Sequence, residues 1–100
     1  MMKEEKDVSN VFLLQVGENI KKKRKENKLS LEKLGLEVGL TRMQIHRIEK
    51  GYNITLKTLI KITLALNVKT EDLVRFEYKV KKDDLEKLVN KNKSFKKKIK

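Results

Sequence analysis

The sequence predicts an all-α fold, and three observations support this prediction. The 100-residue chain contains no proline and four glycines, so sharp breaks are few. Apolar residues recur three and four positions apart, as on one face of a helix, and no long stretch alternates with the period of two that is typical of strands. Serine, threonine, glycine and asparagine stand where helices begin and end.

The first predicted helix spans about residues 10–27, with Ser9 as its N-cap. Four residues spaced four apart share one face of this helix: Phe12, Val16, Ile20 and Arg24. Three of them are apolar, so Arg24 should point at the core. A buried guanidinium needs a partner there.

Two short helices joined by a tight turn are predicted next. Ser30 is the N-cap of the first, and Gly39 ends it in the usual place for a left-handed cap. Gly35 inside this helix costs about 1 kcal/mol relative to alanine. We expect a close approach of the following helix at Gly35 to compensate for that cost.

The second of these helices begins at Thr41 and closes at Lys50 and Gly51. Its apolar side, formed by isoleucines, also carries Glu49. Because Arg24 and Glu49 both lie on apolar faces, we predict that they form a buried ion pair. The alternative is that both reach solvent at the ends of their helices.

Two more helices follow, and the pattern allows a third. The fourth helix follows Thr55, ends at Asn67 and contains six apolar or nearly apolar residues: Leu56, Leu59, Ile60, Thr63, Leu64 and Leu66. The fifth follows Thr70, and residues 83–92 could form a sixth around Leu85, Leu88 and Val89. We therefore divide the chain into an N-terminal extension (1–9), a helical domain (10–76) and a basic C-terminal extension (77–100).

Charge and composition limit the class of protein. A hydrophobic content of 38% supports one small core, and the absence of cysteine excludes disulfides and thiolate metal sites. Apolar runs are too short for a membrane span and the first ten residues lack the apolar stretch of a signal peptide, so we expect a cytoplasmic protein. The net charge is +12, of which residues 79–100 supply +7. This excess favours a polyanion such as nucleic acid as the partner, although lysine also serves simply as a solubilising residue.

The order and endings of these helices carry a family resemblance over about residues 16–74. The specific parts are a leucine–serine pair before the second helix, a VG turn, an I-x-x-I-E-x-G ending of the third helix and leucine–asparagine–valine after the fourth. They resemble the Cro/phage-repressor-like (Xre-type) helix-turn-helix family. The resemblance implies a compact five-helix, lambda-repressor-like DNA-binding domain in which Thr41–Lys50 is the recognition helix. It also implies the Arg24–Glu49 pair.

Three positions depart from the family pattern. Leu31 replaces a glutamine that contacts phosphate, Gly35 replaces a small alanine, and Ile54 replaces a proline. The string NITLKTL that contains Ile54 is similar to controller proteins of restriction–modification systems.

Candidate DNA contacts follow from the resemblance and from side-chain chemistry. Arginine can pair with guanine, glutamine with adenine, and methionine can pack against a thymine methyl group. The predicted base contacts are Arg42, Met43, Gln44 and Arg47. The predicted backbone contacts are Lys22, Lys23, Lys25, Thr41, His46, Lys50 and Lys57. The alternative is that these charges are solvated, or that the arginines touch only phosphate.

The sequence therefore predicts a sequence-specific double-stranded DNA-binding transcriptional regulator. No phosphate-binding glycine loop, nucleophile or metal-spaced cluster indicates an enzyme, and we expect no cofactor or metal. A homodimer on a palindromic operator is expected, since pairing doubles a small interface. Two alternatives are an antitoxin-like protein whose tail binds a partner toxin and a nonspecific architectural DNA binder. The candidate dimer contacts are Leu73, Phe76, Tyr78, Leu85 and Leu88.

Overall fold

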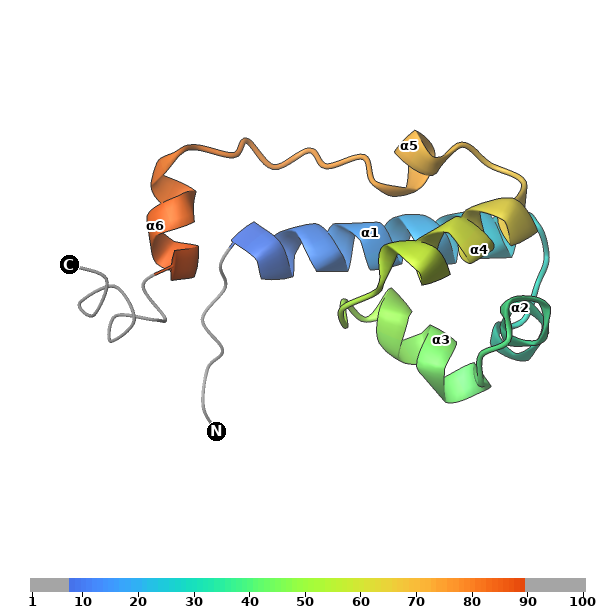
Figure 1. Cartoon of the computed structure of the whole chain (residues 1–100). Helices are drawn as coiled ribbons and strands as arrows, with labels where there is room; N and C mark the ends of the chain where they lie inside the picture. Colours follow the sequence, from blue (N-terminus) through green and yellow to red (C-terminus); the bar gives the residue numbers. More distant parts are fainter. Residues whose placement is uncertain (1–7, 90–100) are drawn as a thin grey trace.

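A computed structural model describes residues 8–89, and every regular element within that range is a helix. The six helices are α1 (Val8–Glu26), α2 (Leu31–Val38), α3 (Arg42–Glu49), α4 (Leu56–Leu66), α5 (Thr70–Leu73) and α6 (Asp83–Val89). In Figure 1, α1 runs along the middle with α4 beside it, α3 lies below them, and α5 lies above. Among the described helices none is both long and apolar enough to cross a membrane. The predicted all-α fold is confirmed.

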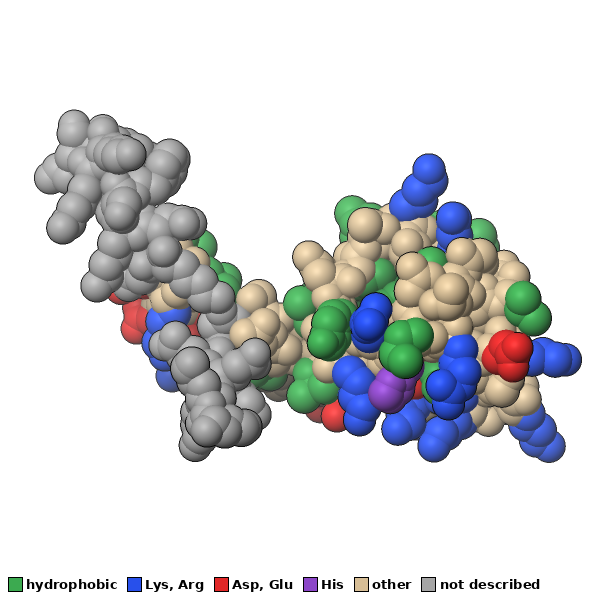
Figure 2. All heavy atoms as spheres, turned by 90° about the horizontal axis from the view of Figure 1, so that it is seen from below, with side chains coloured by type: hydrophobic (Ala, Val, Ile, Leu, Met, Phe, Trp, Pro, Cys, Tyr) green, Lys and Arg blue, Asp and Glu red, His purple; other side chains and the backbone are tan. Residues whose placement is uncertain are grey.

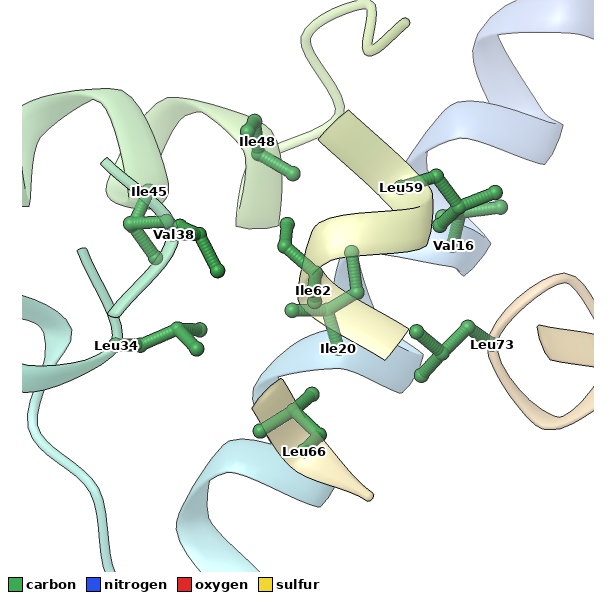
Figure 3. Packing of buried hydrophobic residues seen from close by; sticks show 10 residues of the cluster. All are labelled: Val16, Ile20, Leu34, Val38, Ile45, Ile48, Leu59, Ile62, Leu66 and Leu73. Carbon is green, nitrogen blue, oxygen red and sulfur yellow. The ribbon is translucent and has the colours of Figure 1, made fainter. Parts of the chain in front are cut away.

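The core forms where α1 to α5 meet. Its members are ten aliphatic residues: Val16, Ile20, Leu34, Val38, Ile45, Ile48, Leu59, Ile62, Leu66 and Leu73. Figure 3 shows side chains from α1, α3 and α4 converging around Ile20 and Ile62, both fully buried. The three- and four-residue spacing seen in the sequence therefore corresponds to one shared interior.

Local side-chain chemistry fixes the ends of the middle helices as predicted. The hydroxyl oxygens of Ser30, Thr41 and Thr55 each accept a hydrogen bond from the backbone N–H three residues later, at 3.0–3.1 Å. Each such N-cap contributes about 1 kcal/mol. Gly39 and Asn67 end α2 and α4 in the left-handed conformation, with φ of 77° and 57°. Glycine and asparagine adopt this conformation more readily than other residues, so both favour the end of a helix at these positions.

Two predicted helix starts are wrong. α1 begins at Val8, so Ser9 lies inside the first turn instead of capping it. Val8 is half-buried and precedes Phe12 by four positions, so it continues the apolar face of the helix by one turn. α5 begins at Thr70 itself; the preceding Lys69 has extended backbone and makes no side-chain cap.

Two glycines allow backbones to meet. A β-carbon on Gly17, in the middle of α1, would lie 2.5 Å from the carbonyl oxygen of Ile48 in α3. A β-carbon on Gly35 would collide with the carbonyl oxygen of Leu40. The close approach predicted at Gly35 therefore exists, but the turn before α3 makes it instead of α3. The approach of α3 itself occurs at Gly17.

The chain beyond α5 is tied back to α1. The side-chain amide of Asn19 donates hydrogen bonds to the carbonyl oxygens of Leu73 and Arg75, at 3.0 and 3.2 Å. The rings of Phe12 and Phe76 pack edge to face with centroids 4.9 Å apart. The chain then reaches α6, which lies beyond the N-terminal end of α1 in Figure 1. The sixth helix is thus confirmed over Asp83–Val89, and residues 90–92 lie outside the described residues.

Candidate nucleic-acid interface

A buried ion pair sets the position of α3. Nε and Nη2 of Arg24 donate to the two carboxylate oxygens of Glu49, at 2.7 and 3.1 Å. Nη1 of Arg24 donates to the carbonyl oxygen of Leu29, at 2.8 Å. The two residues are only 7% and 6% exposed, so this bidentate ion pair is shielded from water. Its two parallel hydrogen bonds fix the position of α3 relative to α1. The predicted ion pair is present, and it joins α1, the α1–α2 loop and the end of α3.

The opposite side of α3 faces solvent. Arg42, Met43 and Arg47 are exposed, and Met43 leaves 49% of its surface uncovered. His46 is half-buried, and Thr41 and Lys50 are exposed at the two ends of the helix. In Figure 2, Lys and Arg side chains gather around the histidine on this face. The structure thus brings most of the predicted contacts on α3 to one basic surface.

Gln44 has a structural task on the same helix. Its Oε1 accepts a hydrogen bond from the backbone N–H of Thr41, at 2.8 Å, while the Thr41 hydroxyl accepts from the backbone N–H of Gln44. This reciprocal capping box occupies one of the two lone pairs of the amide oxygen. Pairing with both N6 and N7 of adenine needs that acceptor. Oε1 keeps a second lone pair and Nε2 keeps its donors, so contact of Gln44 with adenine stays a prediction.

A groove separates α3 from the first turn of α4. It encloses about 250 Å³, and its lining includes Gln44, Arg47, Tyr52, Thr55 and Thr58. The groove therefore combines an arginine with the N-terminus of an 11-residue helix, whose free backbone N–H groups favour an anion such as phosphate. Tyr52 is a groove residue that was not predicted from the sequence. The sequence signal that could have indicated it is a tyrosine directly after Gly51, the glycine that closes α3.

The predicted phosphate-binding lysines do not share one surface. Lys57 lies in the first turn of α4, between two threonines that line the groove. Lys22 and Lys23 instead line a polar pocket together with Asp72 and Arg75, at the boundary between α1 and α5. Lys23 also contacts Glu26 at 3.4 Å.

Helix geometry explains this separation. Successive residues of a helix advance by 100°, and Gly17 and Arg24 occupy the side of α1 that faces α3. Lys22 and Lys23 therefore project elsewhere, and the structure separates them from the other predicted contacts. Lys25 lies a quarter-turn past Arg24 and is exposed. Phosphate contact by each of the three predicted lysines on α1 stays a prediction.

The predicted dimer contacts are also unequal. Leu73 is fully buried in the core, so its prediction as a surface contact is wrong. Phe76 is engaged by Phe12 and by Tyr78, whose ring stacks on it at 5.7 Å. Tyr78 and Leu85 remain exposed at 47% and 56%, and Leu88 is half-buried. Within residues 8–89, no group of three His, Cys, Asp or Glu side chains is placed to hold a metal ion.

Comparisons with known proteins agree with this architecture. Residues 20–73, more than half of the chain, match the sequence profile of a helix-turn-helix family. A comparison with curated protein sequences finds no match.

Three solved structures resemble the chain. The restriction-modification controller protein C.AhdI from Aeromonas hydrophila is 29% identical, with a TM-score of 0.59 over 61% of this chain and 94% of that chain. The SinR protein/SinI protein complex contains a chain that is 26% identical, with a TM-score of 0.58 over 84% of this chain and 90% of its own. The hypothetical transcription factor NHTF from Neisseria, at 24% identity, shares the fold with a TM-score of 0.61 over 88% and 97%.

Proposed function

Because the chain belongs to the helix-turn-helix family of the Cro/C1 type, we propose that it is a sequence-specific, double-stranded DNA-binding transcription regulator. In this proposal α3, with its flanking residues Thr41 and Lys50, enters the major groove, and two copies of the chain bind one operator. The likeness to the controller protein C.AhdI supports a regulator of this type.

The observation that carries the proposal is the division of α3 into two sides. Its inner side is fixed by Ile45, Ile48 and the Arg24–Glu49 pair, all buried. Its outer side leaves Arg42, Met43 and Arg47 exposed. Arginine can donate two parallel hydrogen bonds to O6 and N7 of guanine, and a thioether can pack against the methyl group of thymine. A rigid helix with this outer side suits the reading of base edges.

Phosphate contacts would position the helix without reading sequence. The groove beside α3 offers the backbone N–H groups at the start of α4, the hydroxyl of Tyr52 and the charge of Lys57. Thr41 and Lys50 lie at the two ends of the same helix, and His46 lies between Arg42 and Met43 on its outward side. In this proposal these groups contact phosphate while Arg42, Met43 and Arg47 face the bases.

Selection from a random duplex DNA library at physiological salt tests the proposal. We expect enrichment of an inverted repeat whose half-sites are centred about one helical turn apart. Arg47→Ala should lose this enrichment, whereas Arg75→Ala should keep it, because Arg75 is an exposed arginine on the α5 side of the domain. Equal binding to all duplexes, with an equally steep dependence on salt, would instead support a nonspecific architectural binder.

A partner protein is a second candidate role for the C-terminal extension. The observation that favours it is the likeness to the SinR chain, which was solved in complex with the SinI protein. Residues 79–100 supply +7 of the net charge, so an acidic partner would fit them. Truncation after residue 78 should then abolish binding of the partner and leave operator selection unchanged.

A further inference from the structure

A cleft, here called the α1 cleft, lies between the first half of α1 and the loop that joins α3 to α4. It encloses about 700 Å³ and is lined by Ser9, Asn10, Val11, Leu13, Leu14, Lys50, Gly51, Tyr52 and Asn53. The loop touches α1 inside the cleft, since a β-carbon on Gly51 would lie 3.3 Å from the Cα atom of Leu14. Two large side chains remain uncovered there, Leu14 at 41% and Tyr52 at 62%. The α1 cleft therefore offers apolar surface directly beside the end of α3.

The described part of the chain ends near this cleft. α6 contacts α1, and in Figure 1 it lies beyond the N-terminal end of α1 and runs from the α5 side toward the α3 side. The α1 cleft begins at the same end, because Ser9 and Asn10 in the first turn of α1 line it. An extended chain spans about 3.3 Å per residue, so residues 90–95 can cover about 20 Å beyond Val89. Residue 95 can therefore reach the cleft.

The residues that follow α6, here called the tail, combine lysines with two apolar side chains. Residues 90–100 contain six lysines and no acidic residue, and their apolar members are Phe95 and Ile99. Lysines bind the phosphates of a duplex by charge, and a phenylalanine adds to such binding only where its ring becomes buried. Phe95 is also the aromatic residue that the length of the tail brings within range of the cleft.

We propose that Phe95 docks in the α1 cleft of its own chain and thereby anchors the tail beside the end of α3. The tail lysines then lie next to Lys50, where the backbone of bound DNA passes. Because the tail is covalently joined to α6, its effective concentration at the cleft exceeds that of a separate partner. This inference rests on the proposed DNA-binding function and adds a contact surface to it.

The charge of the α1 cleft makes this docking depend on DNA. Among the described residues that line it, Lys50 is the only one with a charged side chain. In the free chain Lys50 repels the tail lysines, whereas a phosphate strand at the end of α3 neutralises both. DNA should therefore favour docking of Phe95, and docking should strengthen DNA binding by the same factor. At about 1 M salt the repulsion is screened beyond roughly 3 Å, so docking should then occur without DNA.

Fluorescence of the full chain tests the docking. The chain contains no tryptophan, so Phe95→Trp introduces a single indole, whose emission moves to shorter wavelength when it is buried. We expect an exposed indole at low salt and this shift on addition of either random-sequence duplex DNA or about 1 M salt. In the Phe95→Trp background, Leu14→Gln should abolish both shifts. The matched control is Leu36→Gln, which changes an exposed leucine on α2 and should retain them.

A substitution that preserves net charge separates an anchored tail from one that acts by charge alone. Phe95→Ser keeps all six lysines, and we expect its affinity for random-sequence duplex DNA to fall by about tenfold or more, because the burial of the ring is lost. The control Asn92→Ser changes a polar residue of the tail and should stay within about twofold. Leu14→Gln should weaken binding as much as Phe95→Ser, and both changes together should be no worse than either alone.

Three results would overturn the proposed docking. They are an indole in Phe95→Trp that stays exposed both with DNA and in high salt, a shift that Leu14→Gln leaves intact, and a Phe95→Ser variant that binds DNA as tightly as wild type. The first result would leave the α1 cleft to another occupant, such as residues 1–7 or a second copy. Failure of the proposed function looks different. A chain that shows both shifts but enriches no inverted repeat from a duplex library would keep the anchored tail and refute the sequence-specific regulator.

Discussion

Gly17 in α1 lies against the backbone of Glu49 in α3, so that a β-carbon at Gly17 would sit 2.6 Å from the Glu49 carbonyl oxygen. Atoms of the main chain cannot yield as the tip of a side chain can. Gly17→Ala should therefore push α3 away from α1 and lower the free energy of unfolding by about 1–3 kcal/mol. This loss exceeds the gain of about 1 kcal/mol in helix propensity. Urea denaturation measures it, with the exposed Glu18→Ala as control; a more stable Gly17→Ala variant would refute the close contact.

The ion pair gives a second prediction. Glu49→Ala leaves the buried guanidinium of Arg24 without its carboxylate, and we expect the free energy of unfolding to fall by about 3–5 kcal/mol. Replacing both residues, as in Arg24→Met with Glu49→Leu, removes the stranded charge and should recover part of this loss. Thermal denaturation checks both variants. An unchanged melting temperature in Glu49→Ala would contradict a stabilising role of the pair.

The capping box on α3 can be separated from DNA binding. Gln44→Glu keeps an acceptor for the Thr41 backbone N–H, so the melting temperature should hold. The change removes the Nε2 donor and adds a negative charge near phosphate, so DNA affinity should fall. Gln44→Ala should instead cost stability, by about 1 kcal/mol. Equal DNA affinity of Gln44→Glu and wild type would show that this side chain only caps the helix.

Arg47 lines the groove and lies on the exposed side of α3. If its guanidinium pairs with guanine, Arg47→Ala should lose about 1–3 kcal/mol of discrimination at one base position. Binding constants for operators substituted at each position would locate that base pair. A uniform loss across all operator sequences would assign Arg47 to phosphate contact alone.

Two lysines test the geometry of the basic surface. Lys57 lies beside the groove next to α3, whereas Lys22 lies on the α5 side of α1. Each phosphate contact contributes about 0.9 to the slope of log binding constant against log salt. Lys57→Ala should reduce this slope by about that amount, and Lys22→Ala should leave it unchanged. The opposite result would place the phosphate contacts on α1.

Features governed by neighbouring residues were predictable from sequence. Ser30, Thr41 and Thr55 are N-caps, and Gly39 is a C-cap, because the hydrogen bonds and the left-handed backbone involve residues a few positions away. The Arg24–Glu49 pair was also predictable, since a charge on an apolar face requires a partner and each helix offered one.

Features that depend on distant segments were not predictable. Gly17 gave no local signal, because the atoms that require a glycine there belong to α3. The lysines at 21–23 and 25 look alike in sequence, and only the docking of α3 and α5 on α1 separates them. Gln44 fits both an outward contact and a cap, and only the structure shows that its Oε1 accepts a hydrogen bond from the Thr41 backbone N–H. α4 is apolar on two sides, and sequence alone does not say which side faces the core.

On α3, the residues that pack against the core are separate from most of those proposed to contact DNA, and this separation has an evolutionary consequence. The side chains that hold the helix in place and those proposed to read DNA are different residues, so substitutions at Arg42, Met43 and Arg47 leave the scaffold intact. Descendants of this chain can therefore acquire new operators without first acquiring compensating mutations elsewhere. Gln44 is the exception, because the side chain that caps the helix is also one of those proposed to contact DNA. Among descendants with different operators, position 44 should remain glutamine while its neighbours diverge.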